Sequence, residues 1–480
     1  MTESKRDCCG SGDKRTNDRY DLAVIGDGSA GFSAAIRAAE LGAQVALIGH
    51  GTIGGTCVNV GCVPSKTLIR ATEALHQAET ASRFAGIHGR AKVTDWRSVI
   101  EQKDELVSSL RQAKYFDLLP AYNTIAYLKG PARLAEGGVA VNGSVVQTEK
   151  VIITTGARPA VPAMPGIERV SYLTSTTAME LERLPKSLLV IGGGYIGCEL
   201  AQMFARTGVK VTIVCRSRIL PKVEPEINEA LVGYFRDEGI SVHEGLSYKA
   251  IDRGENGISL TATEAGGEVR LDAEEVLIAT GRQPNTDGLG LEEAGIEVLD
   301  NGGIVVNDMM KTSKAGVYAA GDVTGRDQYV YMAAYGAKIA AENALNGDAR
   351  RYDATTMPSV VFTDPQVASV GLTEREAREQ GLRVRTTTLP LDYVPRALAA
   401  RDTRGLIKLV AGQDGRLLGA HMLAPEGADS IQTAALAIKH GLTVADLGET
   451  IFPYLTTVEG LKLAAQTFEK DVTKLSCCAG

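Results

Sequence analysis

The sequence predicts an α/β protein with two Rossmann-like folds, because one pattern of strand, glycine-rich turn and helix occurs twice. The first copy is DLAVIGDGSAG, with glycines at 26, 28 and 31, and the second is LLVIGGGYIG, with glycines at 192, 194 and 197. A second apolar strand follows each copy at the same offset, ending at Ile48 and at Val214. A glycine turn alone is a weak signal, whereas this order of strand, turn, helix and strand is specific.

Each glycine-rich turn is a predicted dinucleotide-binding site. The glycines permit a tight turn and a close approach of the backbone to a pyrophosphate, whose charge is stabilised by the N-terminus of the following helix. A glycine-rich turn without a ligand is the alternative for either copy, and the repetition disfavours it for both.

The composition narrows the class of protein further. A chain of 480 residues has room for about three or four domains. The net charge of -7 comes without a basic stripe, so nothing indicates binding to nucleic acid or to an anionic membrane surface. Residues 1–18 are charged and contain no apolar stretch of signal-peptide length, and no later segment approaches ~18 uninterrupted apolar residues, so we expect a cytoplasmic protein.

The residues after each second strand indicate which nucleotide binds. A carboxylate at this point binds a ribose 2′-hydroxyl, whereas an arginine accepts a 2′-phosphate. The second copy continues with Arg216 and Arg218 and has no acid, which favours NADPH; a solvated strand end is the alternative. The first copy continues with Gly49 and His50, and it also lacks an acid.

Cys57 and Cys62 form the first cysteine pair, in the segment GTCVNVGCVP. The proline at 64 suits the first turn of a helix, and a helix N-terminus stabilises a thiolate. We therefore expect a redox-active pair. Half of a structural zinc site is the alternative, but it needs two further ligands, and none lies nearby at finger-like spacing. Two single cysteines, Cys198 and Cys215, are expected to be buried in the second Rossmann-like fold.

Cys477 and Cys478 form the second pair. Adjacent α-carbons are about 3.8 Å apart, below the ~4.4 Å lower end of ordinary disulfides, so a disulfide between them would be strained. Metal binding is the easier use, because soft thiolates select soft ions and can pass them on by ligand exchange. Cysteines without a role are the alternative. Cys8 and Cys9 lie in a polar segment, and two alternatives stay open for them: they bind metal ions, or they have no role.

The order of the motifs GDGSAG, GGTCVNVGCVPSK, GGGYIGCE, ATGRQPN, VYAAGD and FPYLTTVEG resembles the flavin-dependent pyridine nucleotide-disulfide oxidoreductases. The resemblance covers nearly the whole chain from Tyr20. It implies FAD on the first fold, NADPH on the second, and a homodimer whose active site is shared between subunits. The implied division is a disordered polar tail at 1–19, an FAD domain at 20–160, an NADPH domain at 161–286, a return segment completing the FAD domain at 287–355, and an α+β interface domain at 356–480.

The resemblance also assigns roles to single residues. Cys62 would be the thiolate that touches the flavin, and Cys57 the thiol that meets the substrate. Lys66 and Glu199 would form an ion pair near the reactive nitrogen of the flavin, and Tyr195 would gate the nicotinamide pocket. The other expected cofactor-binding residues are Gly26, Gly28, Ser29, Ala30, Gly31, Gly55, Thr56, Thr155, Gly156, Gly192, Gly194, Gly197, Arg216, Arg218, Gly281, Arg282, Gly321 and Asp322. One departure stands out, because Gly49 replaces the glutamate that usually binds the FAD ribose.

A second departure concerns the substrate. Disulfide reductases of this family use a His-Pro pair followed by a glutamate, and the histidine protonates the departing thiolate. The matching stretch here runs from Tyr454 to Glu459, and none of the six histidines lies in it. This disfavours the activities of dihydrolipoamide dehydrogenase and glutathione reductase, which are the alternative enzymes.

With SCCAG at 476–480, the chain resembles in particular the members of the family that reduce mercuric ion. We therefore expect NADPH-dependent reduction of Hg(II) to Hg(0), with Hg(II) arriving as thiol complexes. Cys477 and Cys478 would pass the metal to Cys57 and Cys62, and Tyr454 would be a phenol ligand close by. A structural tyrosine in the dimer interface is the alternative for Tyr454. A metal-sequestering protein is the non-enzymatic alternative, but it would not need two dinucleotide folds.

Overall fold

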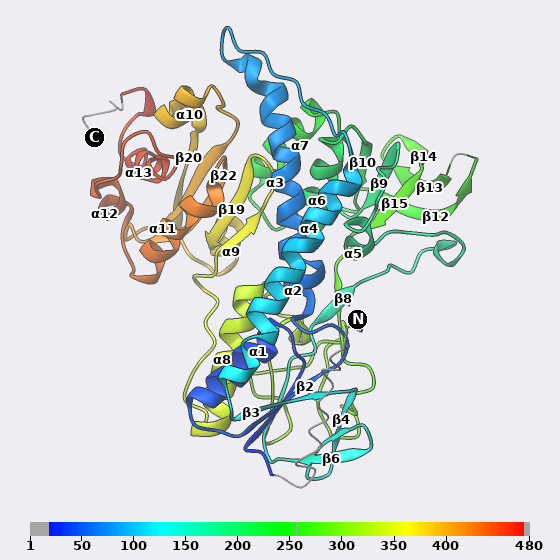
Figure 1. The fold of residues 1–480 in the computed structure, drawn as a ribbon. Helices are drawn as coiled ribbons and strands as arrows, with labels where there is room; N and C mark the ends of the chain where they lie inside the picture. The colour runs from blue at the N-terminus through cyan, green and yellow to red at the C-terminus, as the bar shows by residue number, and fades with distance from the viewer. Residues whose placement is uncertain (1–18, 256, 475–480) are drawn as a thin grey trace, which may run out of the picture. The chain divides into compact units, whose positions relative to one another are not determined.

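The computed structural model describes residues 19–255 and 257–474. The expected tail up to residue 18 and the cysteines at 8, 9, 477 and 478 lie outside the described residues. The chain forms two compact units, each assembled from three segments (Figure 1). The first unit consists of Met1–Cys57, Leu110–Arg158 and Gln283–Tyr352, and the second of Val58–Ser109, Pro159–Arg282 and Asp353–Gly480.

The first unit contains a five-stranded sheet in the order β17-β7-β1-β2-β3, in which all strands are parallel. Its strands are β1 (Leu22–Ile25), β2 (Val45–Gly49), β3 (Ile125–Lys129), β7 (Val151–Ile153) and β17 (Val317–Ala319). Helices α1 (Ser29–Glu40) and α8 (Val330–Asn346) pack against each other. Strands β1, β2 and β7 are buried along their whole length, because helices and loops cover both faces of a parallel sheet.

An antiparallel sheet of three strands completes the first unit. Its strands are β4 (Ala132–Ala135), β5 (Gly138–Val141) and β6 (Ser144–Gln147). The hydrophobic core of the unit joins these strands to the parallel sheet and to apolar side chains between residues 289 and 304. The return segment expected from the sequence therefore contributes both a strand and core residues to this unit.

The second unit contains the other Rossmann-like fold, a parallel sheet in the order β11-β10-β9-β15. Its strands are β9 (Ser187–Ile191), β10 (Lys210–Val214), β11 (Ser241–His243) and β15 (Glu275–Ile278). The helices of this region are α3 (Cys62–Glu79), α5 (Ser175–Ala178), α6 (Tyr195–Ala205) and α7 (Pro225–Asp237). An antiparallel sheet follows, made of β12 (Ser247–Gly254), β13 (Gly257–Glu264) and β14 (Gly267–Ala273). Four further elements span a boundary between the units: α2 (Gly55–Val60), α4 (Trp96–Arg111), β8 (Ala157–Pro159) and β16 (Arg282–Pro284).

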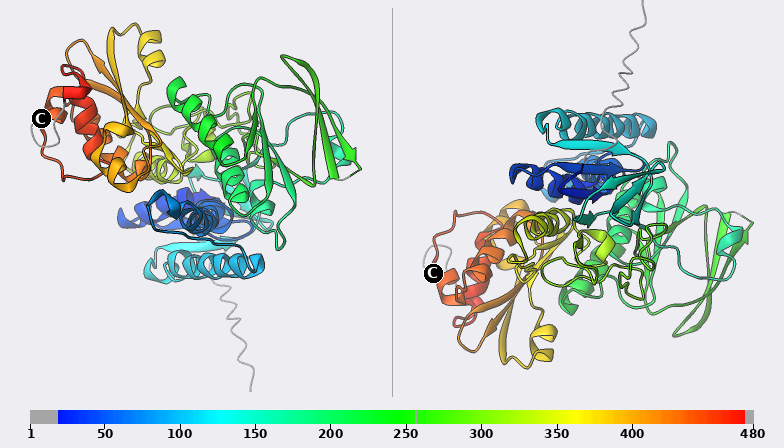
Figure 2. Two further views of the ribbon diagram at one scale, coloured as in Figure 1. Left: turned by 90° about the horizontal axis from the view of Figure 1, so that it is seen from above. Right: turned by 90° about the horizontal axis from the view of Figure 1, so that it is seen from below.

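The C-terminal part of the second unit is an antiparallel sheet in the order β18-β19-β22-β21-β20. Its strands are β18 (Ser359–Val361), β19 (Gln366–Gly371), β20 (Val384–Pro390), β21 (Leu406–Gly412) and β22 (Leu417–Ala424). Its helices are α9 (Glu374–Glu379), α10 (Pro395–Ala400), α11 (Gly427–Lys439), α12 (Val444–Glu449) and α13 (Glu459–Gln466). Helices α12 and α13, drawn in red, lie together beside this sheet (Figure 2).

The observed architecture confirms the predicted fold class of two Rossmann-like folds followed by an α+β region. No helix among residues 19–255 and 257–474 is long and apolar enough to cross a membrane.

Candidate active site

The first glycine-rich turn has the geometry of a pyrophosphate site. Gly26 has a φ of 118°, and a Cβ atom at Gly31 would overlap the carbonyl oxygen of Gly26, so both positions require glycine. Helix α1 begins at Ser29, and no side chain caps it at Gly28. Its first N–H groups therefore point toward the edge of the sheet without a side-chain acceptor, which suits a bound anion.

Two further segments of the first unit meet this turn. A Cβ atom at Gly55 would lie 2.6 Å from the α-carbon of Gly28, and one at Gly321 would lie 3.2 Å from the Cβ of Ala30. The structure therefore brings the loop that precedes Cys57, and the Gly321–Asp322 segment, against the first turn of α1. Thr56, the next residue after Gly55, is exposed.

Thr155 and Gly156 follow strand β7 and are held by a distant segment of the same unit. The hydroxyl of Thr155 donates to the carbonyl of Asn285 at 2.6 Å, and the N–H of Asn285 donates to the carbonyl of Gly156 at 2.9 Å. The two residues are therefore fixed beside the carboxyl end of β7, at the same edge of the sheet as the glycine turn.

The second glycine-rich turn repeats the geometry of the first. Gly192 has a φ of 121°, and a Cβ atom at Gly197 would overlap the carbonyl oxygen of Gly192. A Cβ atom at Gly194 would meet no described heavy atom within 4 Å, so the space in front of this turn is open. Tyr195 begins α6 and is half-buried. Further along the same unit, Gly281 is exposed with a φ of 117° and Arg282 is half-buried.

The two arginines expected to bind a 2′-phosphate differ in their surroundings. Arg216 is exposed just beyond strand β10, and its guanidinium lies over the ring of Tyr248 at 5.4 Å from the ring centre. Arg218 donates to the carbonyl oxygens of Pro221 at 3.3 Å and Val223 at 2.7 Å. Arg218 is therefore bound to the following loop, whereas Arg216 presents its charge to solvent.

Cys57 and Cys62 lie near the beginnings of two consecutive helices. Cys57 is in the short helix α2, and Cys62 is the first residue of the 18-residue helix α3, which has no side-chain cap at Gly61. Both side chains are half-buried. In the described part of the chain, no three or more histidine, cysteine, aspartate or glutamate side chains are grouped so that they could hold a metal ion.

Lys66 follows Cys62 by one helical turn, so the two residues lie on the same face of α3. The Nζ atom of Lys66 is 2.7 Å from Oε2 of Glu199, which is only 6% exposed. The other carboxylate oxygen of Glu199 accepts the N–H of Phe362 at 2.9 Å, and Nζ lies 4.7 Å from the centre of the Phe362 ring. The structure thus brings together the expected Lys66–Glu199 pair and adds a backbone donor that holds the carboxylate.

Tyr454 and Glu459 lie in one loop with different exposures. Tyr454 is 52% exposed, whereas Glu459 is 6% exposed at the start of α13. Glu459 accepts the N–H of Leu455 at 3.2 Å, and burial raises the pKa of the Glu459 carboxyl above its ordinary value. The hydroxyl of Thr457 donates to Glu426 at 2.9 Å. These bonds fix the loop in which the half-exposed Tyr454 lies.

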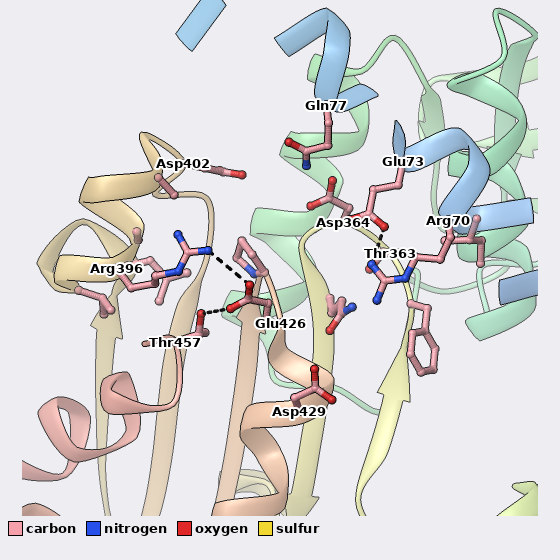
Figure 3. Close-up of a pocket in the computed structure, with 18 of the residues that line it drawn as sticks. Arg70, Glu73, Gln77, Thr363, Asp364, Arg396, Asp402, Glu426, Asp429 and Thr457 are labelled. Carbon is pink, nitrogen blue, oxygen red and sulfur yellow. Dashed lines mark hydrogen bonds and ion pairs between the residues drawn. The ribbon is translucent and has the colours of Figure 1, made fainter. Parts of the chain in front are cut away.

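A cavity of about 380 Å³ lies within the second unit, between α3 and the C-terminal sheet (Figure 3). Its lining is strongly charged and includes Lys66, Arg70, Glu73, Arg206, Asp364, Arg396, Asp402, Glu426 and Asp429. The cavity borders both helix α3, at Lys66, and the loop from Tyr454 to Glu459, at Thr457. No sequence signal pointed to it, because its residues come from segments that are far apart in the chain.

Sequence reasoning also missed Asp27, Tyr127 and Phe362. Asp27 stands between two of the turn glycines, and the hydroxyl of Tyr127 donates to its carboxylate at 2.8 Å. The acidic residue was visible inside the first glycine turn, but its partner on β3 was not. Phe362 acts through its backbone N–H, and no side-chain motif could have indicated that contact.

The expected burial of Cys198 and Cys215 is confirmed. Burial raises the pKa of Cys215 to about 12, and it also raises the pKa of Cys198. These thiols are therefore poor nucleophiles and poor metal ligands at neutral pH.

Comparison with known proteins identifies the family. The family described as pyridine nucleotide-disulphide oxidoreductase matches residues 20–341, and the dimerisation domain of the same family matches residues 357–465. The chain belongs to the pyridine nucleotide-disulphide oxidoreductases, as its motifs indicated. It is therefore an oxidoreductase that uses a flavin and a pyridine nucleotide.

Several relatives have a more particular name. The mercuric reductase of Streptomyces lividans is 48% identical over 471 residues, which cover 96% of this chain and 98% of that protein. The mercuric reductase of Lysinibacillus sphaericus is 47% identical over 466 residues, which cover 96% of this chain and 85% of that protein. Among solved structures, the Cu(II) complex of the HOCl-induced flavoprotein disulfide reductase RclA from Escherichia coli is 32% identical, with a TM-score of 0.83 over 94% of this chain and 100% of that one.

The burial of Cys198 and Cys215 predicts how the thiols react. With a pKa near 12, about one Cys215 thiol in ten thousand is ionised at pH 8. Brief treatment of the pre-reduced native protein with iodoacetamide at pH 8 should therefore modify Cys57 much faster than Cys198 or Cys215, as read by peptide mass spectrometry. Denaturant should make all of them reactive. Equal native rates at Cys57 and Cys215 would contradict the burial argument.

Proposed function

We propose that this protein is an NADPH-dependent flavoenzyme that reduces Hg(II) to Hg(0) through FAD and the Cys57/Cys62 pair. The observation that carries the proposal is the combination of this cysteine pair with Tyr454 at the position where disulfide reductases of the family have a histidine. The names of the relatives support the same substrate. Each turnover would consume one NADPH and one Hg(II) and yield NADP⁺, a proton and Hg(0), so that two electrons are transferred.

The residues of the first unit fit FAD. The uncapped N-terminus of α1 and the close approach of Gly28 and Gly55 leave room for a pyrophosphate against bare backbone. When bound, the flavin would supply two-electron transfer from the nicotinamide to the cysteine pair. Gly321, which lies against the same helix, and the neighbouring Asp322 would border the rest of the cofactor.

The residues of the second unit fit the pyridine nucleotide. Lys66 carries its positive charge on α3, one turn after Cys62, and Glu199 orients it through a buried carboxylate that the backbone N–H of Phe362 holds in place. The open turn at Gly194 suits the pyrophosphate of NADPH, and Tyr195 would cover the nicotinamide pocket. Arg216 is the better candidate for the 2′-phosphate, because Arg218 is already bound to backbone carbonyls.

The metal would enter from the partner subunit of a homodimer. The C-terminal domain exposes several apolar side chains, as an interface between two copies of the chain requires; they are Leu398, Leu436, Leu442, Ile451, Tyr454 and Leu455. Cys477 and Cys478 of one subunit would exchange Hg(II) with Cys57 and Cys62 of the other. Tyr454 would offer a phenol oxygen as a further ligand during this exchange. The proposal uses both cysteine pairs for catalysis and metal transfer and not as structural disulfides. This is the usual role of cysteine pairs in a reducing compartment and favours a cytoplasmic location.

The alternative activities are those of a dihydrolipoamide dehydrogenase or a glutathione reductase. Both need a proton donor for the departing thiolate, and the loop at 454–459 contains none of the histidines. The buried carboxyl of Glu459 is bonded to the N–H of Leu455 and has no imidazole in its loop to orient.

One assay compares the candidate activities. Oxidation of NADPH by the purified protein should be much faster with Hg(II) in excess thiol than with lipoamide, oxidised glutathione or no acceptor, and the replacement Cys57→Ala should abolish the Hg(II)-dependent part. The physical reason is that electrons leave only through an intact cysteine pair. A higher rate with either organic disulfide would assign the protein to the alternative activity.

The choice of nicotinamide should depend mainly on Arg216. Charge-assisted hydrogen bonds contribute about 1.5–3 kcal/mol, so Arg216→Gln should raise the KM for NADPH by about tenfold or more and change the KM for NADH little. Arg236→Gln, on the exposed face of α7, is the matched control for loss of one charge. Equal effects of Arg216→Gln on both nicotinamides would place the 2′-phosphate elsewhere.

Tyr454 should act at the metal and not at the flavin. Tyr454→Phe keeps the ring and removes the phenol oxygen, so Hg(II) turnover should fall several-fold while flavin reduction by NADPH, measured by stopped-flow absorbance, stays unchanged. If Hg(II) turnover is unaltered, Tyr454 does not act at the metal, and the alternative of a structural role in the dimer interface holds.

A heterodimer tests whether Tyr454 serves the partner's cysteines. A dimer of one Cys57→Ala chain and one Tyr454→Phe chain keeps one site with both groups intact, so it should regain about half of the wild-type rate. A purified heterodimer no more active than the mean of its two parents would exclude a shared site.

A further inference from the structure

Strand β2 of the first unit ends at a glycine, Gly49, which has no side chain that could bind a ligand. In a dinucleotide-binding fold a carboxylate at this point binds the ribose hydroxyls of the adenosine. Here the strand ends at Gly49, which is buried, and the next residue is the exposed His50. The ribose of the FAD proposed above therefore lacks its usual partner at this position.

The space beside Gly49 is filled by a different carboxylate. A Cβ atom on Gly49 would overlap the carboxylate of Asp27 and lie 2.6 Å from the hydroxyl oxygen of Tyr127. This follows from the sheet register, because β1 and β2 are parallel with Ile25 opposite Ile48, so the turn residues after β1 lie next to the end of β2. The side chain of Asp27 thus reaches the place where a side chain of residue 49 would begin.

The Asp27 carboxylate is held in position and kept apart from bulk water. Asp27 is 6% exposed, and the hydroxyl of Tyr127 on the neighbouring strand β3 donates to its Oδ2 atom at 2.8 Å. Burial raises the pKa of Asp27, and the bond from Tyr127 together with the nearby charges of His50 and Lys129 acts in the opposite direction. A carboxylate can accept about four hydrogen bonds, so Tyr127 leaves capacity for further donors.

We propose that Asp27 takes over the adenosine ribose of FAD from the missing carboxylate at position 49. This inference rests on the proposed FAD cofactor. It also agrees with the connectivity of a dinucleotide, in which the adenosine ribose is bonded directly to the pyrophosphate. Asp27 stands between Gly26 and Gly28 of the pyrophosphate turn, so a group bonded to the pyrophosphate passes close to its carboxylate.

Binding of modified flavins to the apoprotein tests this assignment. The Kd of flavin-free protein is measured by flavin fluorescence for FAD and for an FAD analogue with 2′-deoxyadenosine. Wild-type protein should bind the analogue about 10- to 100-fold more weakly, as expected for loss of a bond to a charged acceptor. Asp27→Asn, which keeps the shape and an acceptor for Tyr127, should weaken FAD by a similar factor and then distinguish the two flavins by less than about threefold.

Two further variants separate a ribose contact from a structural role. Asp117→Asn, which removes an exposed carboxylate from the same unit, should leave both Kd values unchanged. Gly49→Glu alone should weaken FAD binding, because the new side chain overlaps Asp27. The double variant Asp27→Gly, Gly49→Glu should bind FAD more tightly than Asp27→Gly alone. It should also again bind the deoxy analogue more weakly than FAD.

The outcomes distinguish this inference from the proposed function. Asp27→Asn protein that still rejects the deoxy analogue as strongly as wild type would overturn the role of Asp27, and so would a folded double variant with the Kd of Asp27→Gly. Wild-type apoprotein that binds no FAD would instead overturn the proposed cofactor itself.

Discussion

The close approach of backbone to backbone at the two glycine turns is the constraint on which the rest of the structure depends. At Gly31 and Gly197 a Cβ atom would overlap the carbonyl oxygen of the first glycine of the same turn. The apolar strand β1 ends at Ile25, and because no side chain intervenes at the turn, α1 can begin at Ser29. The N–H groups of its first turn then face the edge of the sheet at which the parallel strands end. The same approach allows Gly55 to touch Gly28, which fixes the start of the helix that contains Cys57.

A second constraint orders the cysteine helix within the second unit. Lys66 on α3 is bonded to Glu199 on α6, and Glu199 is bonded in turn to the backbone of Phe362 after β18. A carboxylate that is 6% exposed must have its hydrogen-bonding capacity satisfied, because an unpaired buried charge is strongly destabilising. The pair therefore does more than a surface ion pair could, since it links three separate segments and sets the position of a positive charge one turn from Cys62.

The parts of the site that could be predicted from the sequence are those encoded locally. Strand, glycine turn and helix follow one another in the chain, so the turns at Gly26 and Gly192 could be predicted from spacing alone. The contact of Asp27 with Gly49 could not, because it depends on the register of β1 against β2. The two arginines after β10 looked equivalent in sequence, and only the path of the chain at Pro221 and Val223 shows that one of them is bound to backbone.

The loop from Tyr454 to Glu459 shows how a buried carboxylate can be satisfied without a histidine. In a His-Glu pair the carboxylate orients an imidazole for proton transfer. In this chain Glu459 instead accepts the N–H of Leu455, a residue with a φ of 59°, a backbone conformation that costs free energy and persists only when its surroundings hold it. Glu459 thus has a structural task in its loop that needs no histidine. Under the proposed function, Tyr454, which is 52% exposed in this loop, would then serve the metal and not a proton transfer.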